Sequence, residues 1–134
     1  MKSNELRIGN LVSYSSEDNT EILPIDCIQS DNTVRLLKSG QSIGCFYADS
    51  IEPILLTPEI LEKAGFKKTK SNDYLKLITE DGWRLCINET DDFDIWYGKE
   101  EFWGDRLPLC SIKFLHQLQN LYFALTGEEL PIEL

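Results

Sequence analysis

The chain has 134 residues, a length that fits one domain or two small subdomains that share a core. Apolar residues make up 42% and charged residues 27%, an ordinary globular balance that argues against intrinsic disorder. The net charge of −10 disfavours binding to nucleic acid phosphates and to anionic lipid. It is compatible with a basic protein partner.

Cysteine spacing and hydropathy indicate in which cellular compartment the protein is expected. The four cysteines lie far apart with no C-x-x-C pair, which excludes a zinc ribbon or a redox motif of the usual kind. No apolar run approaches the roughly 18 residues that a membrane helix needs, and no apolar segment follows the N-terminus as in a signal peptide. We therefore expect reduced thiols in a cytoplasmic protein without a membrane span.

Short β-rich runs separated by turn residues fill the first 56 residues. In the second run Pro24 has no N–H to donate, so that strand is expected to lie at an edge or to contain a bulge. Five strands at this spacing predict a small SH3-like barrel, with the turn 48–50 before the last strand. The predicted strands are 11–14, 21–28, 33–37, 43–47 and 51–55.

A short helix is predicted directly after these strands, over about eight residues from 57. Thr57 can cap the helix, Pro58 suits its first position and Glu59 faces its positive end. Gly65 can adopt the left-handed conformation that ends a helix. So short a helix must be stabilised by tertiary contacts.

Residues 74–97 predict a three-stranded antiparallel meander. Asp81-Gly82 between two β-rich runs is the strongest local hairpin signal in the chain. In the second run, Trp83, Leu85 and Ile87 fall on one face, as expected for a sheet with one solvated side.

The last predicted element is a long helix over 112–126. Phe114, Leu118, Leu121 and Leu125 recur at helical spacing, and Gly127 follows as a terminator. The fold class expected from all elements is α+β. It comprises an N-terminal SH3-like small β-barrel over 1–56, then a helix, a three-stranded antiparallel meander and a long C-terminal helix over 57–134.

Three segments carry a resemblance to a known group of proteins: His116–Leu130 (HQLQNLYFALTGEEL), Leu6–Asn10 and Ile51–Thr57. They resemble a family of small uncharacterised proteins from gut Bacteroidetes genomes, often encoded beside phage-like or mobile-element genes. The resemblance covers both ends and the middle of the chain, whereas 67–104 departs from it. It implies a cytoplasmic accessory protein and brings no activity or catalytic residues with it.

No catalytic, cofactor or metal site is predicted. His116 is the single histidine, and its offset from the apolar stripe is typical of a histidine on a helix surface. The sequence has no nucleophile elbow, phosphate-binding loop or dinucleotide fingerprint. The acids at 91–94 lack the spacing of a calcium loop. The sequence therefore favours a protein that is not an enzyme.

An acidic stretch that also holds aromatic residues is the candidate binding site. Residues 89–105 carry seven acidic residues against one lysine. Aromatic anchors inside a charged rim are typical of protein interfaces. The predicted interaction residues are Trp96, Phe102, Trp103, Asp94, Glu100 and Glu101. In the competing interpretation, Trp83 and Tyr97 fill the core while Trp96 or Trp103 covers a sheet edge.

Three functional hypotheses follow from these observations. The first is a non-enzymatic accessory protein of phage or mobile-element type that binds another protein, basic in character, through the acidic aromatic stretch. The second is an acidic decoy that mimics nucleic acid, which requires an elongated continuous acidic face. The third is an enzyme with an unfamiliar site, which requires a deep pocket around His116 or a cysteine.

Overall fold

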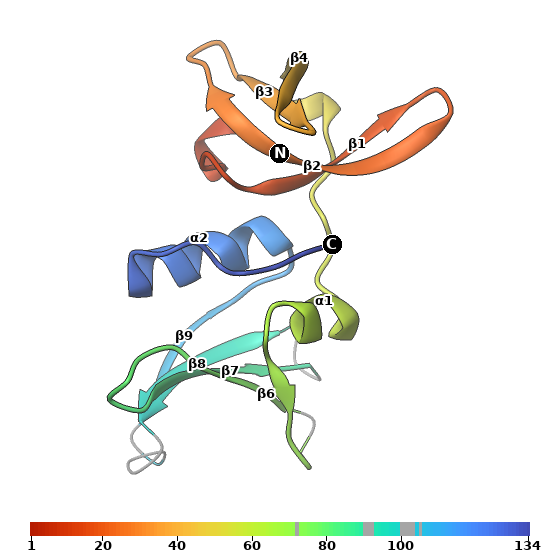
Figure 1. Cartoon of the computed structure of the whole chain (residues 1–134). Helices are drawn as coiled ribbons and strands as arrows, with labels where there is room; N and C mark the ends of the chain where they lie inside the picture. Colours follow the sequence, from red (N-terminus) through yellow and green to blue (C-terminus); the bar gives the residue numbers. More distant parts are fainter. Residues whose placement is uncertain (72, 90–92, 100–103, 105) are drawn as a thin grey trace. The chain divides into compact units, whose positions relative to one another are not determined.

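The computed structural model describes residues 1–71, 73–89, 93–99, 104 and 106–134, and these fall into two compact units. The first unit comprises 1–55 and 114–124, and the second comprises 56–113 and 125–134. Each unit is built on one antiparallel sheet (Figure 1). The long segment between the two parts of the first unit contains the whole sheet of the second.

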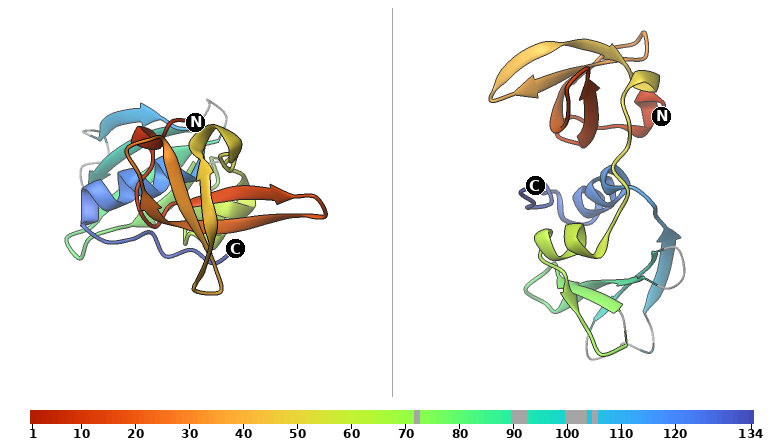
Figure 2. Two further views of the ribbon diagram at one scale, coloured as in Figure 1. Left: turned by 90° about the horizontal axis from the view of Figure 1, so that it is seen from above. Right: turned by 90° about the vertical axis from the view of Figure 1, so that its right-hand side faces the viewer.

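The first sheet has the strand order β1-β2-β3-β4. Its two hairpins, β1–β2 and β3–β4, extend in different directions (Figure 2). The inner strand β2 pairs with β1 through residues 19–24 and with β3 from Ile25 onward, with a register shift between Ile25 and Cys27. Pro24 therefore lies where β2 changes its partner, close to the bulge that its missing N–H led us to expect. The bounds are β1 Leu11–Ser16, β2 Asn19–Ile28, β3 Thr33–Lys38 and β4 Gln41–Tyr47.

The predicted SH3-like barrel is wrong, because the fifth strand does not form and the sheet does not close. A 3₁₀ turn, η2 (Ala48–Ser50), follows β4. After it, Glu52 makes one isolated bridge to Ser13, with N–O distances of 2.9 and 3.0 Å in the two directions. The next residue, Pro53, has no N–H with which to extend that ladder. The predicted strand 51–55 is thereby reduced to single bridges.

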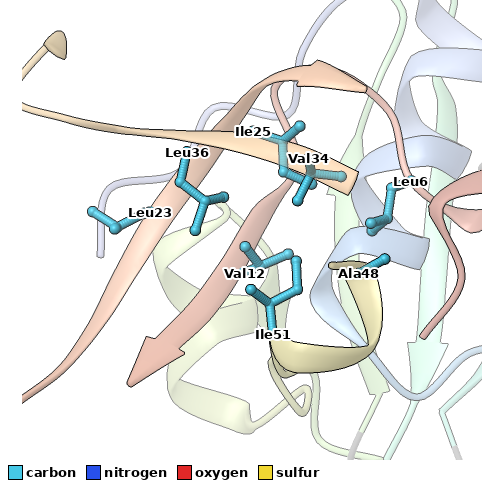
Figure 3. Packing of buried hydrophobic residues seen from close by; sticks show 8 residues of the cluster. All are labelled: Leu6, Val12, Leu23, Ile25, Val34, Leu36, Ala48 and Ile51. Carbon is cyan, nitrogen blue, oxygen red and sulfur yellow. The ribbon is translucent and has the colours of Figure 1, made fainter. Parts of the chain in front are cut away.

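One face of the first sheet and the turns beside it enclose a hydrophobic core. Val34 and Leu36 alternate along β3, and Leu23 and Ile25 alternate along β2, so their side chains share a face. Figure 3 shows these side chains gathered with others from β1, from η2 and from the N-terminal residues. The eight core residues are Leu6, Val12, Leu23, Ile25, Val34, Leu36, Ala48 and Ile51.

The second unit begins with the short helix α1 (Pro58–Lys63), whose predicted ends are confirmed. The Ile60 N–H donates to Thr57 Oγ1 at 3.3 Å, which is the expected cap. At the other end, Gly65 has φ +90°. The Lys76 ammonium donates a hydrogen bond of 2.9 Å to the Ala64 carbonyl, and so satisfies one of the last acceptors of this helix.

The second sheet has the strand order β5-β6-β7-β8-β9. The predicted meander corresponds to β6–β8, and its hairpin at Asp81-Gly82 is confirmed, with Gly82 at φ +92°. Cross-strand register places Tyr74, Ile87 and Ile95 in one row on the buried face. The strands β5 and β9 were not predicted. The bounds are β5 Lys67–Lys68, β6 Asp73–Leu77, β7 Trp83–Asn88, β8 Asp94–Lys99 and β9 Leu107–Ser111.

The last helix, α2 (Leu115–Thr126), is confirmed, with Gly127 at φ +73° after it. Its buried face differs from the predicted stripe, because Gln119 and His116 are buried while Leu121 and Leu125 are only half-buried. The predicted fold class is also wrong as a whole. The described chain is mostly β, with two antiparallel sheets and the helices α1 and α2.

Candidate protein-binding surface on β8 and β9

The outer strand β9 is exposed along its whole length although most of its residues are apolar. All five residues of Leu107–Ser111 are exposed, and Leu107 and Leu109 are exposed to 56% and 37%. β9 lies at the end of the second sheet, where β8 is its neighbour. Exposed apolar residues that are contiguous in this way mark interaction sites more often than scattered ones do.

A bulge sets the direction of the β9 side chains. Ile95 pairs with Cys110 and Trp96 pairs with Pro108, so Leu109 is the extra residue between them. Bulges of this kind redirect side chains and are frequent beside functional sites. Pro108 and the bulge both hinder the addition of a further strand to this edge. The surface is therefore suited to contacts through side chains.

A shallow concavity of about 230 Å³ lies along β8 and β9. It is lined by Trp96 and Asp94 from β8 and by Pro108 to Ser111 from β9. Its volume is below the roughly 300–1,000 Å³ of sites that bind drug-sized ligands. A space of this size suits a side chain of a partner protein better than a cofactor.

Trp96 is half-buried beside this concavity and carries a cation on its ring. The Arg106 guanidinium lies 4.8 Å from the centroid of the Trp96 ring, in cation–π geometry. Tryptophan and arginine are the residue types most enriched among residues that dominate binding energy at interfaces. Trp96 gives the concavity an aromatic wall.

Asp94 supplies the negative charge at the same place. Its carboxylate accepts a hydrogen bond from Ser111 Oγ across the β8–β9 pair. Of the predicted interaction residues, Asp94 and Trp96 thus lie together at one concavity. The other four, Glu100, Glu101, Phe102 and Trp103, lie outside the described residues.

The competing interpretation placed Trp83 and Tyr97 in the core. Both side chains are half-buried, and their rings stack with centroids 4.7 Å apart and an interplanar angle of 20°. Lys99 Nζ lies 5.7 Å from the centroid of the Trp83 ring. Register puts this stack on the face opposite Trp96.

Sequence reasoning missed the β9 half of this surface and its arginine. The available signal was the apolar run Leu107–Cys110 after Gly104, which is short and β-compatible. Pro108 within the run argued against a strand, since proline is confined to edges and bulges. Both conditions apply here, because β9 is an edge strand and carries a bulge.

Outside this surface, the described part of the chain holds no further candidate for a reactive thiol at Cys86, for a metal site or for a membrane-spanning helix. Burial raises the pKa of the Cys86 thiol to about 11, so this group stays protonated and unreactive near neutral pH. Among described residues, no three His, Cys, Asp or Glu side chains are placed to hold a metal ion. The described residues form two α-helices, α1 and α2, and neither is long and apolar enough to cross a membrane.

Comparison with protein-family models, with curated proteins and with solved structures finds no match to this chain. The resemblance of its three sequence segments to the Bacteroidetes family therefore stays a prediction.

Proposed function

We propose that this chain is a non-enzymatic accessory protein that binds another protein through the β8–β9 surface, formed by Asp94, Trp96 and residues 106–111. The observation that carries the proposal is the largely apolar edge strand β9, which is exposed along its whole length beside the concavity at Trp96. The four free cysteines support a reducing, cytoplasmic setting for this interaction. The resemblance of the sequence segments supports a role in phage or mobile-element biology.

The chemistry of the surface defines the partner as a basic segment with at least one aliphatic side chain. The aliphatic group would enter the concavity against Trp96 and Pro108. Lysine or arginine beside it would pair with Asp94 and with the acidic stretch 89–105 that flanks β9 in the sequence. The net charge of −10 would accelerate the approach of such a partner.

A peptide-display selection against the purified protein tests this proposal. We expect enriched peptides to combine aliphatic with basic residues, and the amide resonances of β8 and β9 to shift when such a peptide is added. Trp96→Ala and Leu109→Ser should each weaken binding at least about tenfold, as expected for anchor residues at an interface. Leu77→Ser is the matched control, since Leu77 is 64% exposed but lies on β6.

Two results would overturn the proposal. One is a selection that enriches no peptide class, and the other is binding that survives Trp96→Ala and Leu109→Ser but is lost in Leu77→Ser. A decoy that mimics nucleic acid predicts a different pattern. Its binding would fall steeply with salt and would respond to charge removal at Asp94 rather than to the apolar substitutions.

A further inference from the structure

His116 is a buried histidine with an unsatisfied nitrogen. It lies in the first turn of α2, is 2% exposed, and its Nδ1 atom has no hydrogen-bond partner. Its ring stacks on Phe114, with centroids 5.8 Å apart and an interplanar angle of 10°. This arrangement accommodates a neutral imidazole, because a buried imidazolium needs an acceptor for each N–H.

The N-terminal segment, residues 1–8, is attached to the same helix. Asn120 Nδ2 donates to the Glu5 carbonyl at 3.1 Å, and the Arg7 guanidinium lies 4.1 Å from the centroid of the Phe123 ring. The 3₁₀ turn η1 (Ser3–Glu5) lies within this segment, followed by Leu6 in the core (Figure 3).

Gly9 and Asn10 connect that segment to strand β2. The Gly9 N–H donates to the Ile25 carbonyl at 2.8 Å, and the Ile25 N–H donates to the Asn10 carbonyl at 2.9 Å. Asn10 Nδ2 also donates to Asn120 Oδ1 at 2.8 Å. Gly9 has φ +97°, a conformation that a glycine leaves at little cost. Two hydrogen bonds cross this glycine, from the Arg7 N–H to Asn10 Oδ1 at 2.7 Å and from the Asn10 N–H to the Arg7 carbonyl at 3.0 Å. Release of residues 1–8 at Gly9 breaks both, while Asn10 keeps its bonds to Ile25 and Asn120.

Several charges act on His116 from the elements around it. The Glu5 carboxylate of η1 favours the imidazolium, whereas the N-terminal amine of Met1 disfavours it. That amine lies 3.8 Å from Asp49 of η2. The position of His116 at the positive end of α2 disfavours a cation as well. Burial is the largest influence, and it lowers the pKa of His116.

We propose that protonation of His116 releases the N-terminal segment from α2, so that this contact is a pH-sensitive latch. The closed arrangement gives the charged ring neither water nor an acceptor at Nδ1. Asn120 and Phe123, which hold Glu5 and Arg7, share one face of α2 with His116, so opening residues 1–8 at Gly9 exposes that face to water. The burial of Leu6 keeps the latch closed while His116 is neutral.

The direction of the pH dependence follows from proton binding. The pKa of His116 in the closed state is lowered, so the open state binds more protons wherever the open histidine titrates. The closed state has its full advantage above the ordinary histidine pKa of about 6.5 and loses it as pH falls toward the closed-state pKa. At about pH 5 the opening equilibrium can rise by at most about 30-fold, the limit for a closed state that takes up no proton.

Because the chain has one histidine, NMR can follow both halves of the latch in one sample. The imidazole Cε1–H resonance reports protonation. Hydrogen exchange of the Ser3 and Arg7 amides, corrected for its intrinsic pH dependence, reports opening, because these amides donate to Asn32 Oδ1 and Asn10 Oδ1 outside the segment. We expect the exchange of both amides to accelerate with falling pH in step with the imidazole, with a midpoint below about 6.5. The Val34 amide on β3 serves as internal control and should not respond.

Variants separate the latch from a general loss of stability. His116→Leu places an apolar side chain without a titratable group at this site, and should make the exchange of the Ser3 amide independent of pH in this range. Glu5→Gln removes the carboxylate that favours the imidazolium, and should lower the imidazole midpoint. An imidazole midpoint at or above about 6.5 would overturn the proposal. So would exchange that follows pH equally in His116→Leu, and the wild-type titration alone decides the matter if that variant does not fold.

Discussion

The end of α1 offers a quantitative test of the second unit. Gly65 has φ +90°, and a Cβ atom added there would lie 2.5 Å from Lys76 Nζ. Gly65→Ala therefore imposes backbone strain and also displaces the ammonium group that donates to the Ala64 carbonyl. The lysine is flexible, so it moves away and the main loss on the side-chain side is this hydrogen bond.

The two contributions can be estimated separately. A left-handed conformation costs a residue with a Cβ about 1–2 kcal/mol. Loss of the Lys76 hydrogen bond costs about 1 kcal/mol after allowance for solvent screening of a partly exposed ammonium. We expect Gly65→Ala to lower the free energy of unfolding by about 2–3 kcal/mol. Gly82→Ala should cost only the first contribution, about 1–2 kcal/mol, because nothing lies within 4 Å of the added Cβ.

Urea unfolding followed by tryptophan fluorescence measures these values, since all three tryptophans fall within residues 56–113 of the second unit. The decisive comparison is Gly65→Ala in a Lys76→Met background, where its cost should fall to that of Gly82→Ala. Equal costs for Gly65→Ala with and without Lys76 would refute the reasoning. They would mean that the ammonium contributes nothing at the end of α1.

Three further tests address the cap, the core and the thiols. Thr57→Ala removes the acceptor for the Ile60 N–H and should cost about 1 kcal/mol in the same urea assay, whereas no change would exclude the cap. Leu36→Ala should cost about 2–5 kcal/mol by circular dichroism because Leu36 is fully buried, while Leu77→Ala should cost little. At about pH 8, Cys45 should react readily with a thiol reagent because it is exposed, whereas Cys86 should react only on unfolding because burial raises its pKa to about 11. Equal reaction rates of the two thiols would contradict the burial of Cys86.

The elements that the sequence predicted correctly depend on chemistry between near neighbours. Thr57 and Pro58 start α1, Asp81-Gly82 turns the β6–β7 hairpin and Gly127 follows the end of α2. In each case a residue's own conformational preference, or a hydrogen bond to a residue three positions away, decides the structure. Such preferences are visible in any window of a few residues.

The failures concern pairing between distant segments. The strand predicted after η2 had suitable residues, but Pro53 interrupts it, so that only isolated bridges form at Glu52 and Leu55 and the barrel stays open. Conversely, Leu107–Ser111 contains a proline and still forms β9, because its neighbour β8 accepts a bulge. Whether a proline ends a strand or is accommodated depends on the partner strand, which the local sequence does not identify.

The candidate site was half predicted for the same reason. Asp94 and Trp96 stand in a stretch whose composition already suggests an interface, and the structure places them at one concavity. Residues of β9 complete that concavity, and their contribution follows only from the β8–β9 register. The composition of the sequence therefore indicated β8, which carries the aromatic anchor Trp96. The neighbouring strand β9 could be identified only from the sheet topology.

The error over His116 has a different origin, since its helix was predicted correctly. A stripe of apolar residues was used to decide which face of α2 is buried, and that criterion assigns histidine and glutamine to solvent. The Leu11 N–H donates to Gln119 Oε1 at 2.9 Å from 108 positions away in the chain, so a polar side chain here belongs inside. Buried polar groups of this kind are paired by tertiary structure alone. On α2, as the structure describes it, His116 Nδ1 is a buried polar atom that stays unpaired, and a change in pH should therefore matter most there.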